Sequence, residues 1–115
     1  MRTYRLTQLS DAVLLRDLAA LIAEDRSTTA AVVAHLAEVD ARRLYLGAGF
    51  SSLFSYCCEV LRLSEHGTYL RIEAARAARR FPTILDLLEE GALNLTTVRL
   101  VAPHLTDENY RELLE

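Results

Sequence analysis

The stretch from Ser10 to Leu46 contains neither glycine nor proline, and its apolar residues recur at helical spacing. Glycine and proline are the residues that most often end helices, so this run predicts helical structure throughout. Ser10 is suited to cap the start, and Asp11 is favourable in a first helical turn. Two arrangements are open: one helix from about 11 to 46, or two helices that meet near Ser27, where the apolar pattern lapses. The absence of a breaking residue favours one helix, straight or slightly kinked.

Glycine, proline and capping residues divide the remainder of the chain into shorter helices. Gly47 and Gly49 form a stop, after which a helix is expected to reach about Leu61. The expected caps and ends of the helices that follow are Ser51, Ser64, Pro82, Gly91, Asn94 and Thr106. No segment alternates with period two, so no sheet is expected. The predicted fold class is all-α: a small multi-helix domain with a long N-terminal helix and a helix-turn-helix-like unit.

The domain organisation follows from the same pattern. Residues 1–9 are a short lead, and residues 10–115 form a single helical domain. The last helix is still in progress at Glu115, so we expect the chain to be the N-terminal part of a longer protein. The chain has no apolar run of signal-peptide type and no stretch of membrane-spanning length. We therefore expect a cytoplasmic protein without a membrane partner.

Positive charge is concentrated in one segment, Arg62 to Pro82. Five of the thirteen basic residues lie there, and all thirteen are arginine. With its two glutamates the segment has a charge of +3, whereas the other residues carry −6. A basic helix on an otherwise acidic chain indicates an anionic partner, and nucleic acid is the first candidate. Arginine also binds phosphate through two parallel hydrogen bonds, which lysine cannot form.

Residues 51–80 have the form of a helix-turn-helix, in which the start of the second helix faces a DNA groove. Spacing of about 100° per residue gives this second helix an apolar face and a polar face. The residues expected on the polar face are Glu65, Thr68, Tyr69, Ile72, Glu73, Arg76, Arg79 and Arg80. The position in the turn where many such motifs carry glycine is Arg62 here.

Several of these side chains are candidates for DNA contacts. Thr68, Tyr69 and Arg76 are candidates for base edges, and Arg79 and Arg80 for phosphates. Ser64, with the amides of the first turn, is a candidate for a further phosphate, and His66 for another DNA contact. The alternative is a solvated face whose arginines form ion pairs with Glu65, Glu73 or the acidic first helix.

No arrangement of residues points to catalysis. The three histidines, His35, His66 and His104, have no metal-ligand spacing. Cys57 and Cys58 are adjacent, lack a second pair, and are expected to be small buried thiols. No nucleophile has a nearby base. We therefore expect no catalytic residue, no metal site and no cofactor in this chain.

Four segments of the chain resemble the N-terminal helical region of a bacterial HNH endonuclease family. They are AEVDARRLYL (37–46), FSYCCEVLRLSEH (54–66), RIEAARAARRFP (71–82) and LTTVRLVAPHLT (95–106), and the resemblance extends from about Ser10 to the end. In that family an HNH nuclease module with metal-binding histidines follows this region. No position here matches that motif, so no catalytic residue is carried over. The resemblance implies a non-catalytic helical domain that engages DNA or dimerises.

Two hypotheses result. In the first, the chain is a DNA-binding domain that acts on double-stranded DNA through the helix after Ser64 and forms a homodimer through the long first helix. In the second, it is a helical dimerisation or protein-interaction domain without direct DNA contact. A helix that long in so small a domain exposes apolar surface unless it packs on a second copy.

Overall fold

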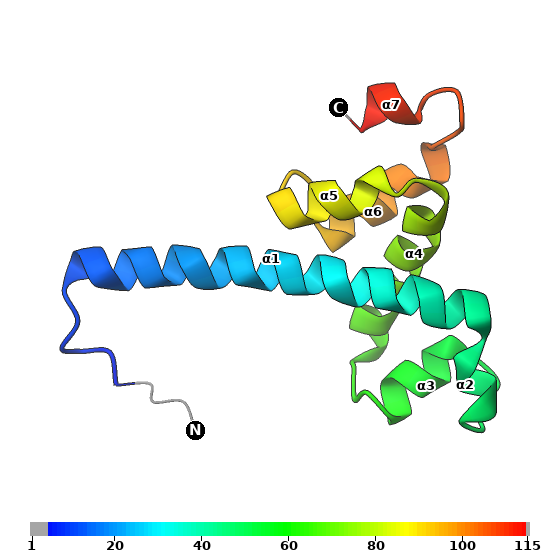
Figure 1. The fold of residues 1–115 in the computed structure, drawn as a ribbon, viewed down its shortest axis with the longest axis horizontal. Coiled ribbons are helices and arrows are strands. Elements are labelled where there is room, and N and C mark those ends of the chain that lie inside the picture. The colour runs from blue at the N-terminus through cyan, green and yellow to red at the C-terminus, as the bar shows by residue number, and fades with distance from the viewer. Residues whose placement is uncertain (1–4, 115) are drawn as a thin grey trace.

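Every regular element within residues 5–114, the part of the chain that the computed structural model describes, is helical (Figure 1). In chain order these elements are α1 (Asp11–Arg42), α2 (Leu44–Gly47), α3 (Leu53–Glu59), α4 (Glu65–Arg80), α5 (Thr83–Glu90), α6 (Leu95–Val101), the 3₁₀ helix η1 (Ala102–His104) and α7 (Tyr110–Leu113). No strand occurs among the described residues, so the predicted all-α class is confirmed.

The first helix is a single element of 32 residues, which decides between the two arrangements left open by the sequence. Ser10 caps it as predicted, since its hydroxyl accepts a hydrogen bond from the Val13 amide at 3.2 Å. The predicted end near residue 46 is wrong. Arg43 adopts a left-handed backbone conformation, with φ of 52°, and this separates α1 from the short α2.

Local capping explains most of the remaining helix ends. The Ser64 hydroxyl accepts from the Gly67 amide at 3.0 Å, and the Asn94 side chain accepts from the Thr97 amide at 2.8 Å, as predicted. Helix α5 spans Thr83–Glu90 and ends at Gly91, whose φ of 84° lies in the left-handed region that glycine tolerates. These three boundaries are confirmed.

Two boundaries differ from the prediction. Ser52, not Ser51, caps α3, and that helix ends at Glu59 rather than near Leu61. The neighbouring serines are chemically equivalent caps, so the choice depends on where the backbone turns. At the other end of the chain, Thr106 accepts from the Asn109 amide at 3.1 Å, but the helix that follows begins only at Tyr110.

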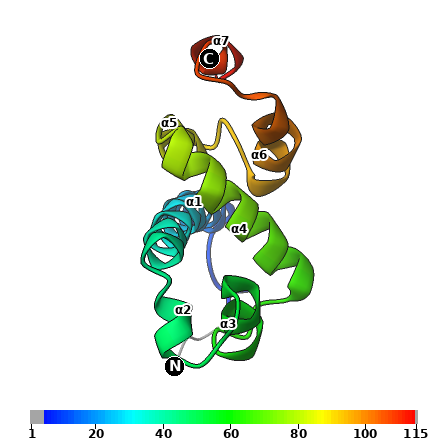
Figure 2. The ribbon, with the colours of Figure 1, turned by 90° about the vertical axis from the view of Figure 1, so that its right-hand side faces the viewer.

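Helix α4 lies at the centre of the domain and contacts α1, α3, α5 and α6 (Figure 2). Alanines at 74, 75 and 78 are buried and let the surrounding helices approach closely. The predicted assignment of Thr68 and Ile72 to its polar face is wrong, since both side chains are buried. A helix with neighbours on several sides buries a wider arc than one amphipathic face.

The N-terminal half of α1 extends away from the rest of the molecule (Figure 1). We call residues 11–28 the α1 arm; none of them is buried. The radius of gyration is 16.9 Å, against about 13 Å for a compact chain of this length. The arm is therefore a helix whose large apolar side chains stay largely uncovered within the described chain.

Candidate functional site

The residues proposed to contact DNA lie at the two ends of α4. Ser64 and His66 lie at its start, whereas Arg79 and Arg80 lie at its end, about 20 Å along the helix axis at 1.5 Å per residue. The Ser64 hydroxyl is already used as the cap. Ser64 and His66 are therefore separated from the arginines by most of the length of α4.

Thr68 is fully buried, at 0% exposure, between α4 and α3. Its hydroxyl accepts a hydrogen bond from the Cys58 thiol, with Sγ and Oγ1 3.6 Å apart. The expectation that Thr68 reaches a base edge is therefore wrong. The sequence does contain the signal for burial, because this position of a helix-turn-helix is usually apolar.

Tyr69 is exposed, but neighbours from α4 and α6 hold its ring. The Arg99 guanidinium lies 5.0 Å from the ring centroid, a cation–π distance, and 3.8 Å from the Glu73 carboxylate. A hydrogen bond to Glu73 raises the pKa of the Tyr69 hydroxyl above its ordinary value. These contacts join α4 to α6 at the molecular surface.

The three arginines near the end of α4 face carboxylates. Arg76 and Arg79 approach Asp40 of α1 at 3.4 and 3.9 Å, and Arg80 approaches Asp107 at 3.3 Å. The ion-pair alternative described above is thus realised with Asp40 as the main acceptor. The arginine side chains stay more than half exposed, so each pair contributes only about 0–1 kcal/mol.

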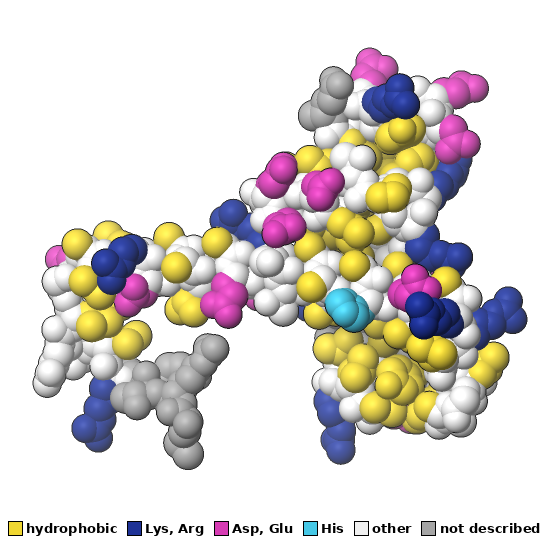
Figure 3. Space-filling model, viewed as in Figure 1, with side chains coloured by type: hydrophobic (Ala, Val, Ile, Leu, Met, Phe, Trp, Pro, Cys, Tyr) yellow, Lys and Arg dark blue, Asp and Glu magenta, His cyan; other side chains and the backbone are white. Residues whose placement is uncertain are grey.

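A second candidate surface runs along the α1 arm, where large apolar side chains gather without cover (Figure 3). Leu15 and Leu18 are 66% and 55% exposed. The other exposed members are Leu14, Leu21 and Ile22, and Leu6 and Leu9 precede the helix. A contiguous exposed apolar surface on a protein marks an interaction site.

The exposed face of α1 follows a heptad pattern. Alternate steps of four and three residues lead through Leu14, Leu18, Leu21, Asp25, Thr28, Val32, His35 and Val39. Steps of this kind place all eight side chains along one line of the helix and are typical of coiled coils. The pattern is present in the sequence and is the signal that identifies this face. Apolar residues at the 3.6-residue spacing of a helix occur both on this face and on the side of α1 that packs on its own domain. That spacing alone therefore does not distinguish the two sides.

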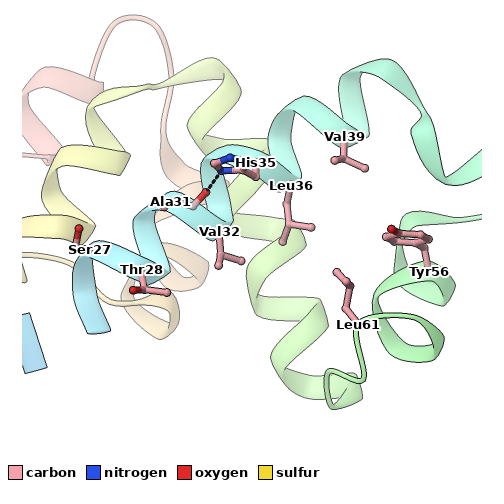
Figure 4. A pocket seen from close by; sticks show the side chains of 9 residues that line it. All are labelled: Ser27, Thr28, Ala31, Val32, His35, Leu36, Val39, Tyr56 and Leu61. Atoms are coloured by element: carbon pink, nitrogen blue, oxygen red, sulfur yellow. Dashed lines mark hydrogen bonds between the residues drawn. The ribbon is translucent and has the colours of Figure 1, made fainter. Parts of the chain in front are cut away.

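The C-terminal half of this face opens into an apolar groove with a volume of about 560 Å³ (Figure 4). Val32, Leu36 and Val39 of α1 form one wall, and Tyr56 and Leu61 face them from α3 and the turn after it. His35 also lines the groove. Its Nδ1 is held 2.6 Å from the Ala31 carbonyl oxygen, so the ring stays against α1.

The two thiols lie on α3. Cys57 is buried in the core, and burial, with a smaller contribution from Cys58, raises the pKa of its thiol. A buried thiol with a raised pKa is a core side chain rather than a nucleophile. Within residues 5–114, no group of three or more His, Cys, Asp and Glu side chains is arranged to hold a metal ion.

None of the helices in the described part of the chain is both long enough and apolar enough to span a membrane. Comparison of the sequence and structure with protein-family models, curated proteins and solved structures gives no match. The relationship to HNH endonucleases stays a prediction.

Proposed function

We propose that this chain is a helical interaction domain that associates with a second copy of itself through the apolar face of α1. The observation that carries the proposal is the row of exposed leucines on the α1 arm, at positions 14, 18 and 21. These side chains follow one line of a helix whose N-terminal half extends away from the rest of the domain.

The energetics of an isolated helix support a partner for the arm. Helices in proteins take most of their stability from packing of an apolar face, and an isolated helix shorter than about 12–15 residues is marginal in water. Residues 11–28 hold no buried side chain. Complete burial of one leucine side chain contributes about 1.5–3 kcal/mol. Covering this row of half-exposed leucines stabilises both the helix and the complex.

The exposed area is large enough for such a complex. The chain exposes 8367 Å², whereas a compact monomer of its mass exposes about 6,300 Å². The excess of about 2,000 Å² is greater than the roughly 800 Å² that each partner buries in a standard interface. Association of two copies can therefore bury a standard interface without opening either domain.

A pair of charge-introducing variants tests this function. In Leu18→Glu/Leu21→Glu, two carboxylates replace leucines of the proposed interface, so we expect a monomer whose domain core stays folded. Leu100→Glu is the matched control, because Leu100 is 67% exposed on α6 and outside the α1 face. Light scattering coupled to size exclusion measures the masses. A dimeric Leu18→Glu/Leu21→Glu variant contradicts the proposal.

A second candidate function is binding of double-stranded DNA, and the arginines at the end of α4 favour it. Arg76, Arg79 and Arg80 expose 64, 51 and 56% of their side chains, and surface ion pairs of this kind are easily exchanged for phosphate contacts. The resemblance to HNH endonucleases points the same way.

Fluorescence anisotropy with random duplex DNA at two salt concentrations tests this second candidate. If it is correct, the wild-type chain binds in a salt-sensitive manner, and changing the three arginines together to alanine removes the binding. Arg16→Ala is the matched control, because Arg16 lies on the arm and pairs with Asp17. Absence of binding at low salt contradicts DNA binding and leaves the interaction domain.

A further inference from the structure

We infer that the two copies pair through antiparallel α1 helices, each arm lying in the groove of the other copy. The inference rests on the proposed self-association and adds its geometry. The leucines of the interface are on the N-terminal half of α1, and the groove is beside its C-terminal half. The α1 helix of a second copy places its leucines in this groove, and its groove over these leucines, only if it runs in the opposite direction.

The heptad positions define the register. A two-fold axis between Arg26 and Ser27 sets each position of one half opposite its counterpart in the other copy. The resulting pairs, each written with one residue from each copy, are Leu14 with Val39, Leu18 with His35, Leu21 with Val32, and Asp25 with Thr28. Every leucine of the arm thereby meets a side chain that lines the groove.

The ends of the paired helices are complementary in charge. Asp11, in the first turn of α1, comes opposite Arg42, in the last turn of the other copy. The antiparallel arrangement also sets the positive end of each helix dipole beside the negative end of its partner. At the centre, each Thr28 hydroxyl can donate to the Asp25 carboxylate of the other copy, and polar residues at such positions fix the register of a coiled coil.

The wall of the groove formed by Tyr56 and Leu61 lies opposite two further apolar side chains of the arm, Leu15 and Ile22. Leu15 and Ile22 each come one residue after a member of the heptad row. They lie on the same side of α1 as Leu36, which faces α3. In an antiparallel pair the corresponding flanks of the two helices face each other. Leu15 and Ile22 of one copy therefore cover Tyr56 and Leu61 of the other, and Leu61 is 46% exposed in the single chain.

Other arrangements of the same helices are poorer. A parallel pair in register brings Asp11 against Asp11 and Asp25 against Asp25, and it leaves both grooves empty. A shift of the antiparallel pair by one heptad places Leu21 opposite Asp25, or Leu18 opposite Arg42, depending on its direction. These mismatches favour the register with the axis between Arg26 and Ser27.

Cross-linking of cysteine variants tests the geometry. Leu18→Cys and His35→Cys chains, alone and mixed, are treated with a short bismaleimide, and the untreated mass is recorded in parallel. Each variant also carries Cys58→Ala, because Cys58 is partly exposed and lies between Tyr56 and Leu61 in the chain, and the Cys58→Ala chain is the control. Circular dichroism verifies that each variant folds. We expect cross-linked dimer, well above the background of this control, only in the mixture.

The outcomes separate this inference from the function on which it rests. Cross-links in Leu18→Cys alone, from a dimeric protein, overturn the antiparallel geometry and keep self-association. A dimer without a cross-link in the mixture overturns the register. A monomeric wild-type chain overturns both.

Charge exchange provides a second test that needs no cysteine. Asp11→Arg and Arg42→Glu should each weaken the dimer at least severalfold, and the double variant Asp11→Arg/Arg42→Glu should recover part of the loss. Arg42 also pairs with Glu38 of its own helix at 2.8 Å, so Arg42→Glu carries a local cost that the double variant does not repair. Recovery therefore reports the contact between copies. Strictly additive losses overturn the pairing of Asp11 with Arg42.

Discussion

The Asp40 carboxylate lies 3.4 Å from the Arg76 guanidinium and joins the C-terminal end of α1 to α4. Arg79 approaches the same carboxylate at 3.9 Å. Only 11% of the Asp40 side chain is exposed, whereas 64% of Arg76 is exposed. The carboxylate, rather than either arginine, is the group that depends on these contacts.

This arrangement predicts a non-additive effect on stability. Arg76→Ala or Arg79→Ala alone should lower the free energy of unfolding by less than about 1 kcal/mol, since Asp40 keeps one partner. The double variant should cost more than the two losses together, by at least about 0.5 kcal/mol, because the carboxylate is then left unpaired. Urea unfolding of the four proteins measures the coupling. Losses that add within error would show that the arginines act independently.

Gly91 gives a prediction about backbone conformation. Its φ of 84° is strained for any L side chain, and a Cβ there would lie 2.8 Å from the tip of Arg26. Gly91→Ala should lower the free energy of unfolding by about 1–2 kcal/mol.

The matched control is Gly47→Ala, because Gly47 has ordinary φ and open space around it. Alanine there should be neutral or slightly stabilising. Thermal unfolding compares the two variants. Equal effects at both positions would contradict the role given to the Gly91 conformation.

The buried Thr68 predicts a contrast between two substitutions. Thr68→Val keeps the shape and removes only the weak hydrogen bond from Cys58, so stability should change by less than about 1.5 kcal/mol. Thr68→Arg places a charge in the core and should unfold the domain. Circular dichroism distinguishes them. A folded, stable Thr68→Arg protein would show that this position is not enclosed by α3 and α4.

The cysteines predict an order of chemical modification. Burial raises the pKa of the Cys57 thiol, so less of it is the reactive thiolate at mildly alkaline pH, and its side chain is closed to reagents. Cys58 should be alkylated first, and Cys57 only after denaturation. Mass spectrometry of peptides after timed iodoacetamide treatment measures the order. Early labelling of Cys57 in the folded protein would be the opposite result.

Features set by short-range chemistry could be predicted from the sequence. The caps at Ser10, Ser64 and Asn94 and the end of α5 at Gly91 depend on contacts within about four residues, and all are confirmed. The absence of glycine and proline from residues 10–46 favours one long helix over two, and the structure confirms one helix. Its end was not, because an arginine in the left-handed region, here Arg43, has no sequence signature.

Features set by tertiary packing could not be read from one helix at a time. Thr68 and Ile72 are buried because α4 has neighbours on several sides, and this depends on segments far along the chain. The ion-pair alternative named Glu65, Glu73 or the acidic first helix as acceptors for the arginines, and nothing local selects Asp40 among them. The exposed leucines were predictable as apolar, yet only the structure shows that no other element covers them.

Sedimentation equilibrium of the wild-type chain, over a wide range of concentrations, tests the central claim most directly. Each chain has a mass of 12.9 kDa. If the apolar face of α1 pairs with a second copy, the measured mass rises with concentration and levels off at twice that value. A mass of one chain at every concentration would contradict the account.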